Sequence, residues 1–238
     1  MDLGPRRAVL QGPSIDTTRI ARIWFAATGS VVVSGILISC ILAGSNSSGH
    51  FGTPAARVFN VFCFFTIQSN VLVGVTSFLL VIRLDRNSTW FAALRLVALV
   101  GIIITFIVYH VALRHLLDLE NWSLLADQIE HNLVPLATIA GWVLFGPRGI
   151  ASRRTVWLSL MFPALYMAFT VIRGEIVHWY PYSFTDVNSL GYGPVLLNAV
   201  WVAIVYLAVA ATAAGLDGPI ARIQGAKQPL PSPPTTLP

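Results

Sequence analysis

Six apolar stretches, each long enough to cross a lipid bilayer, constrain the fold of this chain more than any other feature. A hydrocarbon core about 30 Å thick needs roughly 20 apolar residues in an α-helix. The stretches cover about residues 22–43, 57–82, 91–113, 126–146, 155–174 and 192–215. Only 11% of the residues are charged, against about 25% in soluble domains. The sequence therefore predicts an all-α membrane protein, a bundle of six transmembrane helices.

Short connections separate the stretches and divide the chain simply. We expect a cytoplasmic N-terminal segment over residues 1–18, a six-helix transmembrane domain over 19–216 and a cytoplasmic tail over 217–238. The tail is rich in proline, threonine and serine after Gln228. Such a composition buries too little apolar surface to fold, so we expect the tail to be disordered. The net charge of +5 comes from basic residues between apolar blocks, which favours membrane orientation over nucleic-acid binding.

The distribution of lysine and arginine predicts the orientation of the bundle, because positive residues accumulate in cytoplasmic loops. With the N-terminus inside, the inner segments hold Arg6, Arg7, Arg19, Arg22, Arg83, Arg86, Arg95, Arg148, Arg153, Arg154, Arg222 and Lys227. The outer segments hold Arg57, Arg114 and Arg173. Twelve against three predicts that both termini are cytoplasmic, in a multi-pass protein of the bacterial inner membrane.

The first apolar stretch has a second interpretation. Leu37-Ile38-Ser39-Cys40 matches a bacterial lipoprotein cleavage box behind a basic N-terminal region. The apolar run is long for a signal peptide, and cleavage would leave five spans, so we expect a retained helix. Cys40 and Cys63 are the only cysteines and are too few for a disulfide framework. We expect no bound metal and no cofactor.

Polar residues inside the apolar stretches are informative, because each costs free energy unless it is paired or lines a cavity. They gather in the halves of four helices that the predicted orientation places outside. The set is Thr66, Gln68, Ser69, Asn70, Tyr109, His110, Arg114, Asp127, Gln128, Glu130, His131, Asn132, Arg173, Glu175 and His178. The inner halves carry few such groups. We therefore predict a shared, water-accessible cavity that opens to the outer face or outer leaflet.

Two of these residues are expected at similar depths. At 1.5 Å per residue, Thr66 lies about 13 Å and His131 about 8 Å below the starts of their predicted helices. Pro135 has no N–H and leaves the carbonyl of His131, four residues earlier, without its helical partner. We expect a kink there. Asp127 is four residues before His131 and shares its helix face.

Each of these residues also has a structural interpretation. Membrane threonines commonly bond to a carbonyl of the preceding turn, which would explain Thr66. A histidine near the interface can simply be solvated. Gln68 and Asn70 could join neighbouring helices by hydrogen bonds. Only their convergence at one depth favours a functional site.

Several short motifs carry a family resemblance. Phe65-Thr66, His131 followed by Pro135, and Trp179-Tyr180-Pro181 with Phe184 occur in this order. In motifs, order and topology, residues 20–215 resemble the eukaryotic androgen-induced and androgen-dependent TFPI-regulating membrane proteins. The chain looks closest to a bacterial six-span branch of that family. The family hydrolyses fatty acid esters of hydroxy fatty acids, and the resemblance implies Thr66 as nucleophile with His131 beside it.

The residue types fit this chemistry. A threonine hydroxyl is a poor nucleophile until a neighbouring base takes its proton, and histidine is the usual base. Spacing makes Asp127 the candidate group that orients His131. The candidate substrate-binding residues are Gln68, Asn70, Asn132, His110, Arg173 and His178; their amides offer donors to an oxyanion, and the arginine offers a partner for a free carboxylate. We therefore expect an intramembrane lipid-ester hydrolase that acts from the outer side, among membrane lipids.

Three other functions stay open at this point. A zinc-dependent membrane hydrolase would need His110, His131 and His178 to converge from three helices, although no two of them are four residues apart. A transporter or channel would use the polar cluster as its path, but six spans without a visible repeat and an apolar inner half argue against one. A binding or assembly subunit would need no chemistry. The sequence indicates neither the natural lipid nor the oligomeric state.

Overall fold

The computed structural model describes residues 15–47, 49–116, 118–223 and 225, and this part of the chain is helical without any β-strand. The longer helices are α1 (Ile15–Ser45), α3 (Phe65–Ile82), α4 (Thr89–Val108), α6 (Val134–Phe145), α8 (Met161–Val177) and α10 (Tyr192–Ile223). The shorter ones are α2 (Pro54–Val61), α5 (Asn121–Gln128), α7 (Arg153–Ser159) and α9 (Val187–Leu190). Two π-helical segments, η1 (Tyr109–Leu113) and η3 (Ile129–Leu133), and two 3₁₀ segments, η2 (Arg114–Leu116) and η4 (Ser183–Thr185), complete the set.

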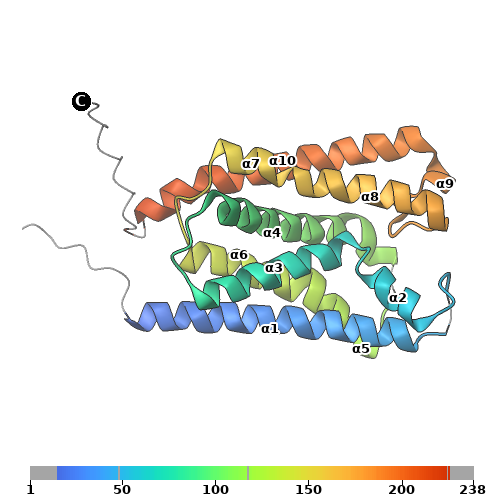
Figure 1. The fold of residues 1–238 in the computed structure, drawn as a ribbon, viewed down its shortest axis with the longest axis horizontal. Coiled ribbons are helices and arrows are strands. Elements are labelled where there is room, and N and C mark those ends of the chain that lie inside the picture. The colour runs from blue at the N-terminus through green and yellow to red at the C-terminus, as the bar shows by residue number, and fades with distance from the viewer. Residues whose placement is uncertain (1–14, 48, 117, 224, 226–238) are drawn as a thin grey trace, which may run out of the picture.

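The helices form an elongated bundle in which most axes run roughly along one direction (Figure 1). In this view α7, α8 and α10 lie on one side, α1 lies on the other, and α3, α4 and α6 lie between them. The start of α1 and the end of α10 lie at the same end of the bundle, which we call the terminal end. The short helices α2, α5 and α9 lie at the opposite end, which we call the α9 end.

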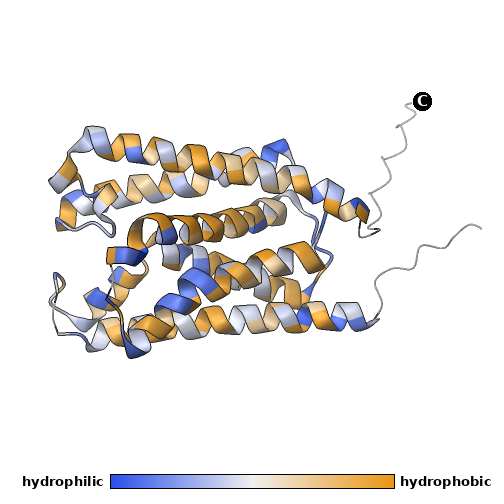
Figure 2. Cartoon of the chain, turned by 180° about the vertical axis from the view of Figure 1, so that it is seen from behind, coloured by the Kyte–Doolittle hydropathy of each residue, from blue (hydrophilic) through white to orange (hydrophobic). Residues whose placement is uncertain are grey.

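Within the part of the chain that the structure describes, five helical segments are long and apolar enough to cross a membrane: Asp16–Ser45, Phe65–Ile82, Thr89–Leu116, Arg153–Val177 and Tyr192–Ile223. Figure 2 shows hydrophobic residues along most of their length. The other predicted span, 126–146, corresponds to α5, η3 and α6, which follow one another without a gap. Its first half carries Asp127, Glu130 and His131, so this segment is less apolar than the five segments named above.

Large apolar side chains cover the outside of the bundle. On α1, α8 and α10 the exposed ones include Ile23, Leu37, Ile41, Leu165, Ile172, Leu197, Trp201 and Ile204. A soluble domain rarely exposes apolar surface on this scale. The distribution fits helices that face lipid on one side and pack against other helices on the other.

Several helix ends differ from the sequence-based expectation. The expected helix over 57–82 is interrupted at residues 62–64, where the N–H groups of Phe62, Cys63 and Phe64 bond to carbonyls three residues earlier and Phe64 is extended. α1 already begins at Ile15, inside the expected N-terminal segment, and α10 continues past 215 to Ile223. The remainder of the expected N-terminal segment, 1–14, and the tail over 226–238 lie outside the described residues.

A buried charged cluster joins three segments at the terminal end. We call it the terminal clamp: Arg95 of α4, Arg148 of the α6–α7 loop and Asp217 of α10. Asp217 Oδ2 accepts the N–H groups of Ile150 at 2.8 Å and Ala151 at 3.0 Å, and Arg148 Nη1 lies 3.9 Å from Asp217 Oδ1. Arg95 donates from Nη2 to the Gly146 carbonyl at 2.7 Å. Two arginines that the sequence places with the inner positive residues therefore have buried side chains.

Candidate active site

The interruption before α3 decides what the Thr66 hydroxyl can do. Thr66 is the second residue of α3, so no preceding helical turn offers its hydroxyl a carbonyl four residues earlier. Thr28, Thr76 and Thr138 lie inside helices, and each donates to the carbonyl four residues before it, at 2.9, 2.9 and 2.7 Å. The structural interpretation that applies to ordinary membrane threonines therefore does not describe Thr66.

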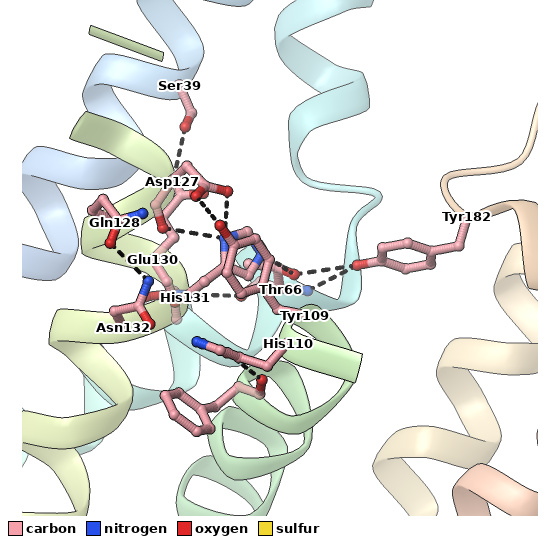
Figure 3. Close-up of polar contacts among 12 residues, drawn as sticks. Ser39, Thr66, Tyr109, His110, Asp127, Gln128, Glu130, His131, Asn132 and Tyr182 are labelled. Carbon is pink, nitrogen blue, oxygen red and sulfur yellow. Dashed lines mark hydrogen bonds and ion pairs between the residues drawn. The ribbon is translucent and has the colours of Figure 1, made fainter. Parts of the chain in front are cut away.

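The Thr66 hydroxyl lies between two polar side chains from distant parts of the chain (Figure 3). Its Oγ1 is 3.3 Å from His131 Nε2 and 3.3 Å from the Tyr182 hydroxyl. The backbone N–H of Thr66 also donates to the Tyr182 oxygen, at 3.2 Å. Thr66 is only 7% exposed. Its hydroxyl is thus buried, has a base on one side and has a phenol on the other.

Asp127 orients the His131 ring. His131 Nδ1 lies 3.0 Å from Asp127 Oδ1 and 3.2 Å from the Asp127 carbonyl oxygen. Both of these partners are acceptors, so the neutral ring carries its proton on Nδ1. The lone pair of Nε2 then faces Thr66, which is the tautomer that a general base needs.

Tyr109 supports both of these residues. Its hydroxyl donates to Asp127 Oδ2 at 2.5 Å. Its ring stacks on the His131 ring, with centroids 4.2 Å apart and an interplanar angle of 15°. The second carboxylate oxygen of Asp127 is therefore occupied, and the imidazole is held flat against an aromatic face.

Two π-helical turns bring Tyr109 and His131 together. Tyr109 is the first residue of η1 and His131 is the middle residue of η3. In η3 the N–H of Val134 bonds to the carbonyl of Ile129, five residues earlier, just before Pro135. The local disturbance expected from Pro135 thus takes the form of a π turn. Such turns are frequent at functional sites because they change the direction of single side chains.

Aromatic packing positions Tyr182 over Thr66. Its ring stacks on Phe184 with centroids 5.2 Å apart, and meets the ring of Phe64 edge-on at 5.7 Å. Neighbouring Tyr180 packs on α8 at Gly174, where an added Cβ would lie 2.0 Å from the Tyr180 ring. Trp179 contacts Phe64 at 5.7 Å. The Trp179-Tyr180-Pro181 motif therefore anchors the segment that delivers Tyr182.

Tyr182 remains a neutral donor over a wide pH range. Burial raises the pKa of its hydroxyl above the ordinary value, because a phenolate would lose hydration there. Its oxygen already accepts the Thr66 N–H. The phenolic proton is therefore available to Thr66 Oγ1 or to another acceptor beside it.

A cavity of about 650 Å³ adjoins this group. Ile104 and Val108 of α4, Pro163 and Met167 of α8, and Val200 and Ala203 of α10 form much of its wall. Thr66 and Tyr182 are among its lining residues, and none of the lining residues is charged. The volume is in the range of small-molecule sites. A polar acid–base group thus meets a space suited to a hydrocarbon chain.

The three amides proposed as oxyanion donors are directed elsewhere. Gln68 donates to the Phe62 carbonyl at 3.1 Å, and Asn132 donates to Gln128 Oε1 at 2.9 Å. Asn70 is fully buried and donates to the carbonyls of Thr66 at 2.9 Å and of Glu130 at 3.2 Å. Asn70 therefore supports the backbone of the site, whereas Gln68 and Asn132 make local contacts.

His110 and Arg173, also predicted to bind substrate, have hydrogen-bond partners other than Thr66. His110 is exposed and bonds through Nδ1 to the Phe106 carbonyl at 3.0 Å. Arg173 donates to Asn60 Oδ1 at 2.8 Å and lies over the rings of Phe51 and Trp179.

His178 is exposed and follows the last residue of α8, in a left-handed conformation. Across the residues that the structure describes, no three His, Cys, Asp or Glu side chains are grouped so that they could hold a metal ion. The convergence of three histidines that a zinc site would need is therefore not observed in this part of the chain.

Tyr182 and the contacts of Tyr109 were not predicted from the sequence. A water-accessible cavity among the polar residues was predicted, whereas the cavity beside Thr66 has a mostly apolar, uncharged lining. Tyr182 lies in a connection 116 residues after Thr66, so no helical periodicity links the two. The one available signal was its position directly after Trp179-Tyr180-Pro181. Tyr109 was included among the polar residues of its helix, without a role.

Comparison with known proteins adds no family: no family model, no curated protein and no solved structure matches this chain. A functional assignment therefore depends on the side chains around Thr66 and on the adjoining cavity.

Proposed function

We propose that this protein is an intramembrane lipid-ester hydrolase with Thr66 as nucleophile and His131 as base. The observation that carries the proposal is the chain of contacts from Tyr109 through Asp127 and His131 to the Thr66 hydroxyl, which ends beside an uncharged cavity. The resemblance of the motifs at Thr66 and His131 to a family of threonine hydrolases supports the same roles.

The first step is acyl transfer to threonine. His131 Nε2 takes the proton of Thr66 as Oγ1 attacks the ester carbonyl carbon, and Asp127 stabilises the imidazolium that forms. The 3.3 Å between Oγ1 and Nε2 is slightly long for a hydrogen bond that transfers a proton. Such distances commonly shorten when substrate binds.

Two groups are suited to stabilise the oxyanion of the tetrahedral intermediate. The Tyr182 hydroxyl lies beside Oγ1 and stays protonated. The N-cap residue of α3, Phe64, supplies no capping side chain, so the positive end of the helix dipole faces the same region. Donors fixed in place before the reaction account for much of the rate enhancement in acyl-transfer enzymes.

The second half of the reaction returns the enzyme to its starting state. The tetrahedral intermediate expels the alcohol part of the ester, which takes the proton from His131 Nε2. Water then attacks the acyl-threonine carbonyl while His131 accepts a proton from it. The C–O bond to Thr66 breaks, the fatty acid leaves and Thr66 recovers its hydrogen.

The cavity favours a fatty-acyl ester with an uncharged chain. Its lining contains no arginine, lysine or histidine, and Arg173 is occupied by Asn60. A free carboxylate on the substrate would therefore have to lie outside the cavity. The acyl chain is the part that the cavity suits.

We also propose that the chain crosses the bacterial inner membrane six times, with both termini in the cytoplasm. The segment 121–145 has about 37 Å of helical length at 1.5 Å per residue, enough to cross. The start of α1 and the end of α10 lie at the same end of the bundle, which supports an even number of crossings. Reporter fusions after Asp85 and Arg153 should then be cytoplasmic, and fusions near Ser47, Glu120 and Asp186 external.

The decisive experiment is turnover of long-chain fatty-acyl esters by purified protein in lipid vesicles. Thr66→Val keeps the shape of the side chain and removes its hydroxyl, so hydrolysis should be lost. Thr76→Val is the matched control, because Thr76 lies on the same helix and its hydroxyl bonds only to its own helix, at the Leu72 and Val73 carbonyls. Normal hydrolysis by Thr66→Val would place the nucleophile elsewhere.

A further inference from the structure

The cavity beside Thr66 reaches the outside of the bundle between α8 and α10. Among its lining residues, Leu196 and Val200 of α10 are 57% and 53% exposed, and Ala164 of α8 and Ala203 of α10 are also exposed. A residue that borders a cavity and is also exposed marks an opening. At this opening two of the side chains are alanines, which leave the gap between the helices wide.

The opening lies at mid-depth of the bundle. Along α10, Val200 and Ala203 are about 12 and 17 Å from the first residue, Tyr192, at 1.5 Å per residue. On α8, Ala164 is about 20 Å from the last residue, Val177, by the same rise. A hydrocarbon core is about 30 Å thick. In a membrane-spanning bundle this opening therefore faces acyl chains rather than headgroups or water.

We propose that the gap between α8 and α10 is a lateral portal through which the acyl chain of a bilayer-dissolved ester enters the cavity. This inference rests on the proposed function. The lining of the cavity indicates which ligand it binds. Apolar side chains surround the opening, and the hydroxyls of Thr66 and Tyr182 also line the cavity. An ester that enters chain first from lipid leaves its apolar part in apolar surroundings throughout.

The main test narrows the portal from either helix. Ala203→Trp on α10 and Ala164→Phe on α8 should each reduce turnover of a long-chain ester in phosphatidylcholine vesicles by roughly tenfold or more, because the gap would be filled. Turnover of 4-nitrophenyl acetate should fall much less than turnover of the long-chain ester, since an acetyl group needs little of the cavity. The control is Ala208→Trp, an exposed position of α10 outside the cavity lining.

The outcomes separate this inference from the proposed function. If the unmodified protein hydrolyses neither ester in a manner that depends on Thr66, the proposed function fails and the portal fails with it. If hydrolysis depends on Thr66 but Ala203→Trp and Ala164→Phe both turn over the long-chain ester like Ala208→Trp, only the portal is overturned. Retained 4-nitrophenyl acetate turnover shows that the narrowed variants are folded.

A second measurement does not depend on bulky substitutions. Val200→Cys, in a protein with Cys40 and Cys63 replaced by alanine, should react with a membrane-soluble maleimide and not with a charged, water-soluble one. A long-chain ester should slow the reaction at Val200→Cys and leave that at Ala208→Cys unchanged. Equal rates at Val200→Cys with and without the ester would contradict passage of the chain through this gap.

Discussion

The terminal clamp and the Thr66 site are both buried polar clusters built around one aspartate, yet they differ in what the aspartate holds. Asp217 uses one oxygen to accept two backbone N–H groups, at Ile150 and Ala151. Asp127 uses its two oxygens on side chains, the Tyr109 hydroxyl and the His131 ring. The first arrangement fixes a loop to a helix, whereas the second orients a group that can transfer protons.

The two clusters also differ in the volume of the cavity beside each of them. The cavity that Arg95 and Asp217 border has a volume of about 20 Å³, and the one beside Thr66 has about 650 Å³. A water molecule fits the first, whereas a substrate fits the second. Buried charge alone thus does not identify a functional site in this bundle. A reactive group that faces open volume is the stronger candidate.

The largest expected effect is at the proposed nucleophile, Thr66, and the proposed base, His131. Thr66→Ala and His131→Ala should each lower ester turnover by roughly 10⁴-fold or more, and the double variant should be scarcely worse, because the two residues act as a unit. Thr66→Ser keeps a hydroxyl and should retain part of the activity. The measurement is ester turnover by each of these four variants as purified, folded protein. Additive losses in the double variant would show that the two residues act independently.

The two aspartates give the most direct test of the comparison. Asp127→Asn should lower turnover by about 10²- to 10⁴-fold, less than His131→Ala, with little change in thermal unfolding. Asp217→Ala should instead lower stability. It leaves the buried Arg148 without its carboxylate partner and should cost about 3–5 kcal/mol of the free energy of unfolding. Turnover per folded molecule should be unchanged. A loss of turnover in folded Asp217→Ala protein would show that the terminal clamp also takes part in the reaction.

The sequence predicted an all-helical membrane protein and the proximity of Thr66, His131 and Asp127, and the physical reason is largely local. Apolar run length predicts membrane helices, and the four-residue spacing of Asp127 and His131 predicts a shared helix face. The interruption at residues 62–64 escaped prediction because it contains neither glycine nor proline. Tyr182 and the cavity depend on how a distant loop packs and how far α8 stands from α4 and α10, and no sequence period encodes those distances.

A smaller effect is expected at Tyr182. Tyr182→Phe keeps the ring that packs against Phe64 and Phe184 and removes only the hydroxyl. Loss of one oxyanion donor costs about 10²- to 10³-fold in kcat where that donor is a main one, and the α3 N-terminus remains here, so we expect roughly 10- to 100-fold. Steady-state kinetics should assign the loss to kcat rather than KM. Gly174→Ala, which would push the Tyr180 ring away from α8, should show the same direction.

The smallest effect is expected at the two histidines that a zinc site would require. His110 bonds to the Phe106 carbonyl of its own helix, and exposed His178 follows the end of α8. The His110 ring meets the Tyr109 ring edge-on, with centroids 5.0 Å apart, but Tyr109 contacts Asp127 through its hydroxyl, and Asp127 in turn contacts His131. His110→Ala and His178→Ala should therefore leave ester turnover within about twofold. A zinc hydrolase that used these two residues with His131 as ligands would lose activity in all three alanine variants, because such a metal site needs three protein ligands. Loss in His131→Ala alone supports a histidine that acts as a base, and equal loss in all three would favour the metal enzyme.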